Sequence, residues 1–317
     1  MDLSVVIPVF NEEESVGELT DWIVKVCNEN KISYEVIFID DGSSDSSWKK
    51  ISEQAEKNNS VKGFRFRRNY GKAAALHTGF TNSSGEVVIT MDSDLQDSPE
   101  EIPELVRMVK EDGYDLVSGW KKKRYDPFIK RTTSRFYNRT ARWASGIKLH
   151  DFNCGLKAYR NEVVKSIEVF GEMHRYIPML AKEAGFKKIG EKTVQHRARK
   201  YGVTKYGLDR FIKGYLDLLT IGFITRFGKN PMHLFGFLGT LMFFAGFIMA
   251  GYLGIRKLVF INNGLRAPLV TDSPYFFIAL TVMIIGSILF LTGFLGELIN
   301  RNSSERNNYL IKDSVNF

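Results

Sequence analysis

A short acidic run, residues 92–97, has the residue types and spacing that most directly suggest chemistry. Asp92 and Asp94 stand two positions apart directly after an apolar stretch, so both carboxylates can turn towards one divalent ion, and Gln96 adds a neutral oxygen at the same spacing. Hard oxygen ligands suit Mg²⁺ or Mn²⁺, which bind through one or two carboxylates together with substrate phosphates. The run therefore fits a metal site.

The same run is also typical of the start of a helix. Ser98 is a suitable N-cap, Pro99 fits the first helical position, and residues 100–110 have a helical pattern. Short acidic motifs match metal sites by chance, so the run by itself leaves both interpretations open. The elements around it have to decide between them.

Apolar strands and amphipathic helices alternate through the first half of the chain. Strands are predicted for residues 3–10, 34–39, 61–66, 86–91 and 115–118, and helices for 13–29, 46–57, 72–81 and 100–110. This alternation predicts an α/β fold with a mainly parallel sheet that is covered on both faces.

Polar residues follow three of the predicted strands, at 11–12, 40–41 and 92–94. In parallel sheets, ligands bind at the carboxyl ends of the strands, and all three clusters are expected at that edge. Their convergence favours the metal site over a simple helix cap.

The C-terminal third has a different composition. Residues 233–255 and 275–296 contain no formal charge, and at 1.5 Å per residue each stretch can cross a hydrocarbon core of about 30 Å. Buried helices of a soluble protein are the alternative, but two such stretches close together favour a transmembrane hairpin. Residues 208–230 before them alternate apolar and charged faces, as an amphipathic helix at the membrane surface or against the preceding domain would.

Charge and cysteine content narrow the class of partner. The net charge is +8, and basic residues crowd 121–142 and 187–205. With two predicted spans, anionic lipid or phosphate substrates explain these segments better than nucleic acid does, and a solvated basic face is the remaining alternative. Two cysteines make no disulfide framework, which fits a reducing compartment, and the acidic residues at 12–14 argue against a signal peptide.

Six motifs in order resemble the signatures of family 2 glycosyltransferases. They are residues 7–12, 39–45, 68–72, 91–97, 151–157 and 199–205. The strongest resemblance is to the polyprenyl-phosphate branch, represented by dolichol-phosphate mannose synthase and bactoprenol glucosyltransferase. Thr204 stands where that branch usually has Ser, and the hydroxyl is kept.

The resemblance implies a GT-A (Rossmann-like) fold and an inverting transfer of a sugar from a nucleotide sugar to a polyprenyl phosphate. A UDP-sugar is the preferred donor and GDP-mannose the alternative, and the sugar itself stays open. Asp92, Asp94 and Gln96 are expected to hold the metal and diphosphate. Nucleotide-sugar binding is expected at Pro8, Phe10, Asn11, Glu12, Asp40, Asp41, Gly71, Lys72, Asp92 and Ser93.

A phosphate acceptor changes what catalysis requires. With a second pKa of about 6, a phosphate monoester arrives mostly as an oxyanion and needs no general base, but cations must hold it near the diphosphate. The predicted lipid-phosphate ligands are Arg124, Arg131, Arg199 and Lys205. Arg131 falls in the acceptor loop of the branch.

The predicted catalytic residues are Asp94, Arg131 and Asp151. Asp151 orients the acceptor or sugar, acts as a base, or only caps a turn, and these roles stay open. Residues 121–123 are assigned to the membrane surface, and His174 and His196 to structural or sugar-adjacent positions.

The expected organisation is a GT-A domain at 1–207, an amphipathic region at 208–230, transmembrane helices at about 233–255 and 275–298 within 231–300, and a cytoplasmic tail at 301–317. The catalytic domain is expected on the cytoplasmic side of the inner membrane. Gly246, Ala250 and Gly254 recur every fourth residue, which favours close helix contact within the hairpin or in a homo-oligomer.

Three other interpretations remain. A transferase with a hydroxyl acceptor would need a base, for which Asp151 is the candidate. A polysaccharide synthase would need more spans and a Gln-x-x-Arg-Trp signature, in which Arg139 replaces the Gln here. An inactive nucleotide-binding scaffold conflicts with the intact acidic run.

Overall fold

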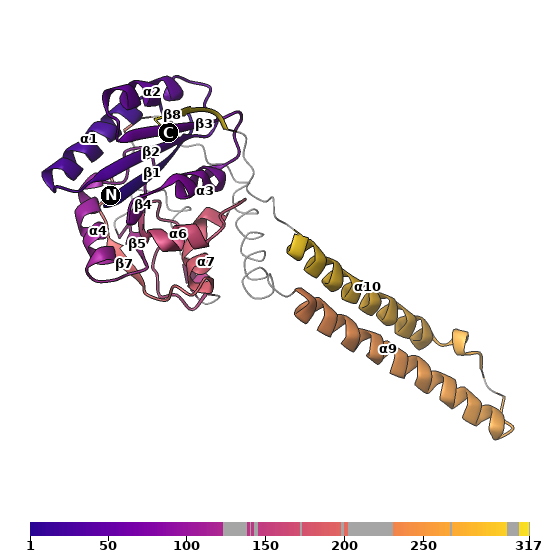
Figure 1. Cartoon of the computed structure of the whole chain (residues 1–317). Coiled ribbons are helices and arrows are strands. Elements are labelled where there is room, and N and C mark those ends of the chain that lie inside the picture. The colour runs from indigo at the N-terminus through magenta and orange to yellow at the C-terminus, as the bar shows by residue number, and fades with distance from the viewer. Residues whose placement is uncertain are drawn as a thin grey trace. The chain divides into compact units, whose positions relative to one another are not determined.

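The computed structural model describes residues 1–122, 138–139, 141–142, 145–171, 173–197, 200–201, 231–266, 268–302 and 311–316. The chain divides into two compact units. One consists of Met1–Ile221 together with Arg306–Phe317, and the other of Gly222–Glu305 (Figure 1).

The described strands of the first unit form one eight-stranded sheet in the order β7-β5-β6-β4-β1-β2-β3-β8. The strands are β1 (Leu3–Val9), β2 (Tyr34–Asp40), β3 (Val61–Phe66), β4 (Val87–Thr90), β5 (Leu116–Trp120), β6 (Lys157–Arg160), β7 (Ile189–Thr193) and β8 (Ile311–Val315). Strands β4, β1, β2 and β3 are parallel neighbours, β5 and β7 are also parallel, and β6 and β8 run antiparallel to their partners.

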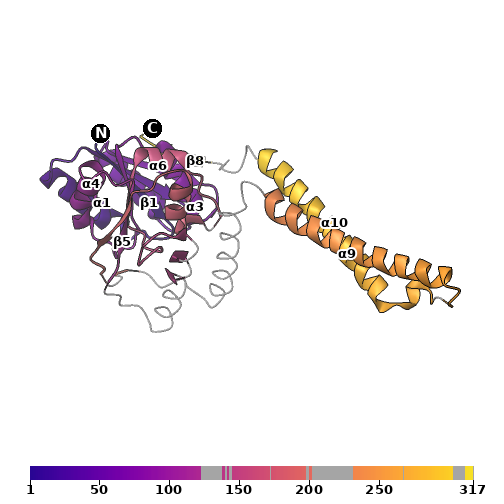
Figure 2. The ribbon, with the colours of Figure 1, turned by 90° about the horizontal axis from the view of Figure 1, so that it is seen from below.

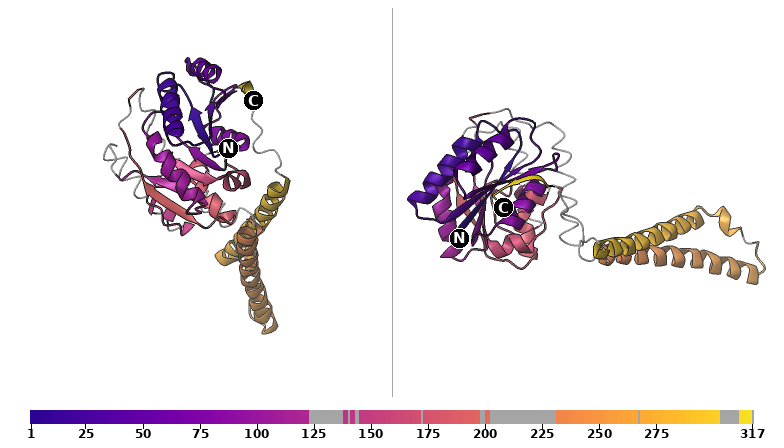
Figure 3. Two further views of the ribbon diagram at one scale, coloured as in Figure 1. Left: turned by 60° about the vertical axis from the view of Figure 1, so that its left-hand side comes forward. Right: turned by 45° about the horizontal axis from the view of Figure 1, so that its top comes forward.

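Helices cover both faces of this sheet (Figure 3). The helices are α1 (Val16–Glu29), α2 (Ser47–Lys57), α3 (Lys72–Asn82), α4 (Ile102–Lys110), α6 (Asn161–Ser166) and α7 (Ile177–Glu183), with short 3₁₀ turns η1 (Pro99–Glu101) and η2 (Met173–Arg175). Side chains of α1, α2 and α4 belong to one buried apolar cluster, and side chains of α3 belong to another.

Strand β2 shows why the sheet needs two layers of helices. Val36 and Phe38 belong to the cluster that includes α1 and α2, whereas Ile37 and Ile39 belong to the cluster that includes α3. Successive side chains of a strand point to opposite faces, so a continuously apolar strand must be buried on both. The predicted α/β fold with a mainly parallel sheet is confirmed.

Three strands were not predicted, and their residues explain why. Strand β6 has four residues with Lys157 and Arg160 at its ends, and β7 is half-exposed at the edge of the sheet. Strand β8 begins 245 positions after the end of β3, the strand it joins (311 − 66). None of them has the alternating or continuous apolar pattern on which strand prediction depends.

The C-terminal strand β8 completes the sheet beside β3 (Figure 1). Its register pairs Gly63 with Val315, and the side-chain amide of Asn316 donates to the carbonyl oxygens of Ala55 at 3.0 Å and Val61 at 2.9 Å. The chain therefore returns to its first domain after the apolar helices.

The second unit is a helical hairpin of α9 (Pro231–Asn262) and α10 (Pro274–Asn302), which lie side by side (Figure 2). A short turn, η3 (Val270–Asp272), precedes α10. Within these helices, Met232–Asn262 and Pro274–Gly296 are long and apolar enough to cross a membrane. Among the described residues, Met1 and Phe10 are exposed, and the other exposed large apolar side chains lie between residues 237 and 299.

Glycines let the two helices of the hairpin approach closely. A Cβ on Gly239 would stand 2.6 Å from the carbonyl oxygen of Gly286, and a Cβ on Gly246 would stand 2.6 Å from that of Ala279. A Cβ on Gly254 would meet nothing within 4 Å. Close contact within the hairpin is therefore confirmed for Gly246 but not formed by Gly254, because a stripe with a four-residue repeat drifts around the helix. Contact through Gly254 in a homo-oligomer stays a prediction.

Candidate active site

The loops that follow β1, β2, β3 and β4 meet at one edge of the sheet, because these four strands are parallel. These loops contain the polar clusters predicted from the sequence. Strand β6 runs the other way, so its first residue, Lys157, pairs with Thr90 and reaches the same edge. The candidate site is therefore assembled from five segments that are distant in sequence.

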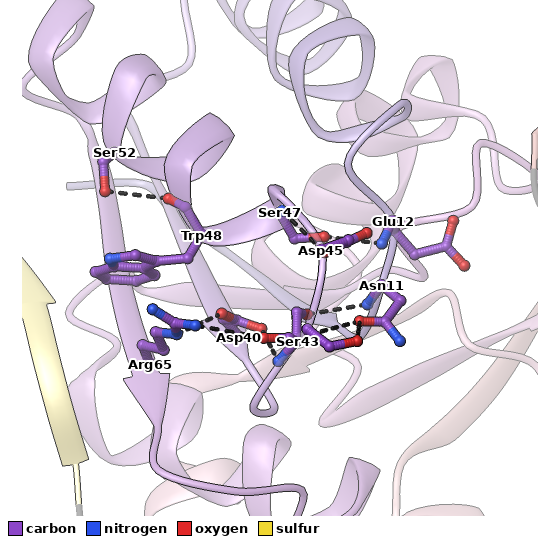
Figure 4. Close-up of polar contacts among 10 residues, drawn as sticks. Asn11, Glu12, Asp40, Ser43, Asp45, Ser47, Trp48, Ser52 and Arg65 are labelled. Atoms are coloured by element: carbon purple, nitrogen blue, oxygen red, sulfur yellow. Dashed lines mark hydrogen bonds and ion pairs between the residues drawn. The ribbon is translucent and has the colours of Figure 1, made fainter.

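The loops after β1 and β2 are joined to each other by hydrogen bonds (Figure 4). The backbone amide of Asn11 donates to Oγ of Ser43 at 2.9 Å, and Oδ1 of Asn11 accepts from the backbone amide of Ser44 at 2.8 Å. The backbone amide of Glu12 donates to Oγ of Ser47, also at 2.9 Å. Asn11 has a φ of 53°, a left-handed conformation that Asn tolerates better than most residues. Asn11 thus shapes this part of the site through its side chain and backbone together.

Asp40, at the end of β2, is fully buried and holds the turn that follows it. One carboxylate oxygen accepts the backbone amide of Ser43 at 2.9 Å, and the other lies 3.3 Å from Nε of Arg65 on β3. Burial raises the pKa of Asp40, and the hydrogen bonds from Ser43 and the charge of Arg65 oppose the rise. These contacts make Asp40 part of the framework beneath the site (Figure 4).

Asp41 ties the loop after β2 to the loop after β3. Its carboxylate oxygens accept the backbone amides of Tyr70 at 2.7 Å and Gly71 at 2.9 Å. Burial raises the pKa of Asp41 to about 6 although both amides favour the ionised form. Gly71, with a φ of 95°, directly precedes α3, so Asp41 fixes the start of that helix.

Pro8 and Phe10 lie at the end of β1 and beyond it. Pro8 is half-buried within the strand, and Phe10 is 37 % exposed. Phe10 thus offers apolar surface beside Asn11, at the edge where the strands end.

Leu95, in the middle of the acidic run, has a strained backbone conformation. Leu95 has a φ of 60°, which is unfavourable for a bulky side chain, yet it is buried in the core that includes α1 and α4. Oδ1 of Asp94 accepts the backbone amide of Gln96 at 3.2 Å. Burial of Leu95 thus forces a tight turn that leaves Asp94 and Gln96 half-buried at the site edge.

Asp92 lies among positive charges. Its carboxylate forms an ion pair with the ammonium of Lys72, the first residue of α3. Burial by itself would raise the pKa of Asp92, but the charges of Lys72, Lys121 and Lys157 hold it well below its usual range. Gly155 packs so closely against this carboxylate that a Cβ there would clash with it. Asp92 is therefore ionised and fixed.

Two cations near Asp92 have positions that the sequence did not reveal: Lys157 is buried, and the side chain of Lys121 is 13 % exposed. Nζ of Lys121 lies 2.7 Å from a carboxylate oxygen of the fully buried Asp97, which raises the pKa of Lys121 against the lowering effect of burial. Lys157 donates to the carbonyl of Cys154, and burial lowers its pKa. The assignment of Lys121 to the membrane surface is therefore wrong, because the end of β5 carries it into the interior; the exposed Lys122 does not contradict that assignment.

The turn that leads into β6 lies at the same edge of the sheet, because Lys157, the first residue of β6, pairs with Thr90 at the end of β4. Asp151 is buried, and its Oδ1 accepts the backbone amide of Asn153 at 3.1 Å. The backbone amide of Asp151 donates to Glu191 at 3.1 Å, and its carbonyl accepts from Ser118 at 3.2 Å. These bonds place Gly155 against Asp92, so Asp151 acts at least as the organiser of this turn.

Several predicted site residues lie outside the described part of the chain. These are Arg124, Arg131, Arg199 and Lys205, together with the amphipathic region 208–230. Their roles stay predictions. Both histidines lie in the described part of the chain. His174 is half-buried, and burial lowers its pKa well below the usual value. The backbone of His196 forms a β-bridge with that of Asp97.

The fold is an α/β domain with a polar edge at the carboxyl ends of its parallel strands, and comparison with known proteins identifies its family. The family model for glycosyl transferase family 2 matches residues 4–168. The chain belongs to this family and is a glycosyltransferase, as the six motifs predicted.

Two curated relatives extend over nearly the whole chain. A dodecaprenyl-phosphate galacturonate synthase from Rhizobium johnstonii is 34 % identical over 304 residues, covering 95 % of this chain and 88 % of its own. An undecaprenyl-phosphate 4-deoxy-4-formamido-L-arabinose transferase from Proteus mirabilis is 37 % identical over 300 residues, covering 94 % and 88 %.

Solved structures agree on the fold. Glucosyl-3-phosphoglycerate synthase from Mycobacterium tuberculosis in complex with phosphoglyceric acid matches with a TM-score of 0.55 at 21 % identity, over 71 % of this chain and 79 % of that one. The same enzyme in complex with Mn²⁺, UDP-glucose and phosphoglyceric acid matches equally well, with a TM-score of 0.55 at 20 % identity, over 71 % and 79 %.

Proposed function

We propose that this glycosyltransferase moves a sugar from a nucleotide sugar, with a UDP-sugar preferred, to a polyprenyl phosphate at a membrane, with inversion at the anomeric carbon. The observation that carries the proposal is the presence, on one chain, of a polar sheet edge suited to a sugar diphosphate and an apolar hairpin suited to a lipid bilayer. The two long relatives, both named for polyprenyl-phosphate acceptors, support it.

The donor is proposed to bind across the loops after β1, β2 and β3. Phe10 would contact the base, and Asn11, Glu12, Asp40 and Asp41 would shape the pocket for base and ribose, with Pro8 supporting the strand. Each carboxylate oxygen has two lone pairs, so Asp41 can accept a ribose hydroxyl in addition to its amide. Gly71, Lys72 and Ser93 would approach the phosphates.

A divalent cation fits the acidic run if the donor completes its coordination. In the described part of the chain no three His, Cys, Asp or Glu side chains come together to hold a metal. Mg²⁺ and Mn²⁺ sites in such enzymes need only one or two carboxylates when phosphates supply other oxygens. Asp94 would be the main ligand, with Asp92 and Gln96 beside it, and the cation would stabilise the departing diphosphate as a Lewis acid.

The protein's own charges would assist the same departure. Lys72 and Lys157 place positive charge at the edge beside Asp92, where negative charge develops on the leaving diphosphate. A phosphate monoester with a second pKa of about 6 is already ionised at neutral pH, so Asp151 is assigned a positioning role in this proposal rather than that of an obligatory base. Arg124, Arg131, Arg199 and Lys205 are proposed to hold the lipid phosphate.

The tail strand supports a hairpin with both ends on one side of the membrane. Strand β8 follows α10 and pairs with β3 of the catalytic sheet, so the chain must return to the side it left. We place that side in the cytoplasm, where nucleotide sugars and reduced cysteines are found, and the membrane is then the inner membrane. Oligomer formation through the hairpin stays a prediction.

The decisive experiment uses the full chain in detergent with undecaprenyl phosphate, Mg²⁺ or Mn²⁺ and a panel of radiolabelled nucleotide sugars. We expect one donor to give a glycolipid, undecaprenol to give none, and EDTA to stop the reaction. Asp94→Asn should lower turnover about 100-fold or more while the protein stays folded. Asp21→Asn, an exposed carboxylate on α1, is the matched control and should leave turnover unchanged. No glycolipid with any donor would refute the proposal.

A further inference from the structure

Residues 150–155, which lead into β6, connect the edge strand β7 with the acidic run. We call these residues the entry turn. The first residues of the entry turn are hydrogen-bonded to β7, and its last residue packs against Asp92. What holds the entry turn therefore bears on where the carboxylate of Asp92 lies.

The last residues of the entry turn fix the surroundings of Asp92. A Cβ on Gly155 would lie 2.6 Å from Cγ of Asp92, so the main chain of the turn is in close contact with that carboxylate. Oγ1 of Thr90 donates to the carbonyl of Gly155 at 2.8 Å, and the ammonium of Lys157 donates to the carbonyl of Cys154. This end of the turn thus holds both the carboxylate and one of the cations beside it.

The first residues of the entry turn are held by Glu191 of β7. Oε1 of Glu191 accepts the backbone amide of His150 at 2.7 Å and that of Asp151 at 3.1 Å, and Oε2 lies 2.7 Å from Nδ1 of His150. The side chain of Glu191 is only 11 % exposed, and hydrogen bonds away from water are electrostatically stronger than exposed ones. One carboxylate therefore binds two successive residues of the turn.

The register of β5 and β7 explains how Glu191 reaches the turn. Glu191 pairs with Ser118 of β5, and the side chains of directly paired residues point to the same face of a sheet. Oγ of Ser118 donates to the carbonyl of Asp151 at 3.2 Å, while Glu191 accepts the amide of the same residue. Asp151 is 1 % exposed. One pair of residues on neighbouring strands thus holds the buried Asp151 by its amide and by its carbonyl.

We propose that Glu191 is a positioning residue for the group that binds a divalent cation and a nucleoside diphosphate. Glu191 fixes the entry turn, and the turn fixes Asp92 and Lys157. Residues that orient a metal-binding carboxylate typically change the metal affinity about 10-fold or more when they are removed. The inference rests on the proposed function, because that proposal assigns Asp92 to the cation and the diphosphate.

The contrary view is that Glu191 only forms an ion pair with His150. The side chain of His150 is 53 % exposed, and its ring stacks on that of Trp120 with the ring centres 4.3 Å apart. For an ion pair the charge of Glu191 matters, whereas for positioning the oxygen that accepts the two amides matters. Glutamine separates these roles, because it keeps an oxygen acceptor and loses the charge.

The test uses the full chain in detergent with Glu191→Ala, Glu191→Gln, Ser118→Ala and Glu162→Ala. Glu162 is the matched control, because it is an exposed carboxylate on α6. Calorimetry measures the affinity for UDP with Mn²⁺ and again with EDTA, below the melting temperature of each variant. Hydrogen exchange of the Asp151 amide reports whether the entry turn is held.

We expect Glu191→Ala to weaken UDP binding about 10-fold with Mn²⁺ and to leave it within about 2-fold with EDTA, because only the cation and diphosphate contacts depend on the entry turn. The Asp151 amide should exchange faster in this variant. Glu191→Gln should stay within about 3-fold under both conditions, since it still accepts the two amides. Ser118→Ala, which removes one of the two bonds to Asp151, should weaken binding about 3-fold with Mn²⁺ alone. Glu162→Ala should change nothing.

A purely stabilising role of Glu191 would lower the melting temperature and leave the Mn²⁺-dependent affinity of the folded protein unchanged, which would overturn the inference. Equal losses with Mn²⁺ and with EDTA would overturn it as well, and so would a glutamine variant as weak as the alanine variant. If Glu191→Ala does not fold, Ser118→Ala decides by the same difference between the two conditions. If the unaltered chain makes no glycolipid, the proposed function fails, and Mn²⁺-dependent UDP binding with Asp151 exchange still decides the role of Glu191.

Discussion

The polar edge of the catalytic sheet and the apolar hairpin achieve fixed geometry in opposite ways. At the sheet edge, the buried carboxylates of Asp41 and Asp97 are held by backbone amides and by the ammonium of Lys121, respectively. In the hairpin, Gly239 and Gly246 let two backbones approach because no side chain intervenes. The geometry of the sheet edge therefore depends on hydrogen bonds and ion pairs to charged groups, whereas the packing of the hairpin depends on glycines that have no side chain.

This difference teaches where each region is sensitive. Removing a charge partner at the edge leaves an uncompensated charge in a medium of low dielectric constant, which costs several kcal/mol. Adding a methyl group in the hairpin forces two helices apart, which is an overpacking cost. The four predictions below test this contrast, beginning with the largest expected effect.

Lys121→Met should destabilise the catalytic domain by about 3–5 kcal/mol, because it leaves the fully buried Asp97 without its cation. Lys122→Met is the matched control, since Lys122 is exposed, and it should change stability by about 0.5 kcal/mol or less. Denaturant titration in detergent gives both values. Equal effects of the two substitutions would show that Lys121 does not pair with Asp97 in solution.

Gly239→Val should destabilise the hairpin by about 3 kcal/mol, because a Cβ at this position would stand 2.6 Å from the carbonyl of Gly286. Gly254→Val is the matched control: it makes the same substitution in the same helix, at a position where a Cβ would meet nothing within 4 Å. Both variants change helix propensity equally, so the difference between their stabilities reports the packing cost alone. Thermal melting of both variants in detergent micelles, followed by helical circular dichroism, measures the difference. A hairpin that tolerates both changes would not be packed through its glycines.

Asp41 should make stability depend on pH by about 2 kcal/mol. Its pKa in the folded protein is raised to about 6, above the value of about 3.9 for a free side chain, so folding favours the protonated form. The contribution is present in full below about pH 4 and is lost as the pH rises through 6.

Asp41→Asn removes this titration. The melting temperature of the unaltered protein should therefore fall, relative to Asp41→Asn, as the pH is raised from 4.5 to 7.5. The comparison is needed because Asp2, Glu18 and Glu35, whose pKa values are lowered, change stability in the opposite sense. A constant difference between the two proteins would contradict the raised pKa.

Asn316→Ala should have the smallest effect, about 1 kcal/mol, through loss of the hydrogen bonds to Ala55 and Val61. The expected result is faster hydrogen exchange in β8 and β3, with exchange in β5 unchanged as an internal control. Unaltered exchange in β8 would mean that the tail strand does not depend on this side chain.

Much of the fold could be predicted from the sequence, because strands β1 to β5 and helices α1 to α4 have local apolar patterns that report burial directly. Strands β6, β7 and β8 could not, since they are short or polar and are strands only because a neighbour offers hydrogen bonds. The glycine spacing in α9 was also insufficient for prediction. It shows where two helices can approach closely, but only the position of the partner helix shows where they do.

The same distinction between local patterns and tertiary contacts applies to the candidate site. Residue types and order alone determined the acidic run, the three polar clusters at the strand ends, the apolar spans and the membership of family 2, because each is a local pattern. Tertiary structure alone decided that Lys121 and Lys157 surround Asp92, that Gly155 closes against it, and that Glu191 accepts the amide of Asp151. Those contacts join segments that are far apart in the chain, and only the packing of the whole sheet sets the distances between them.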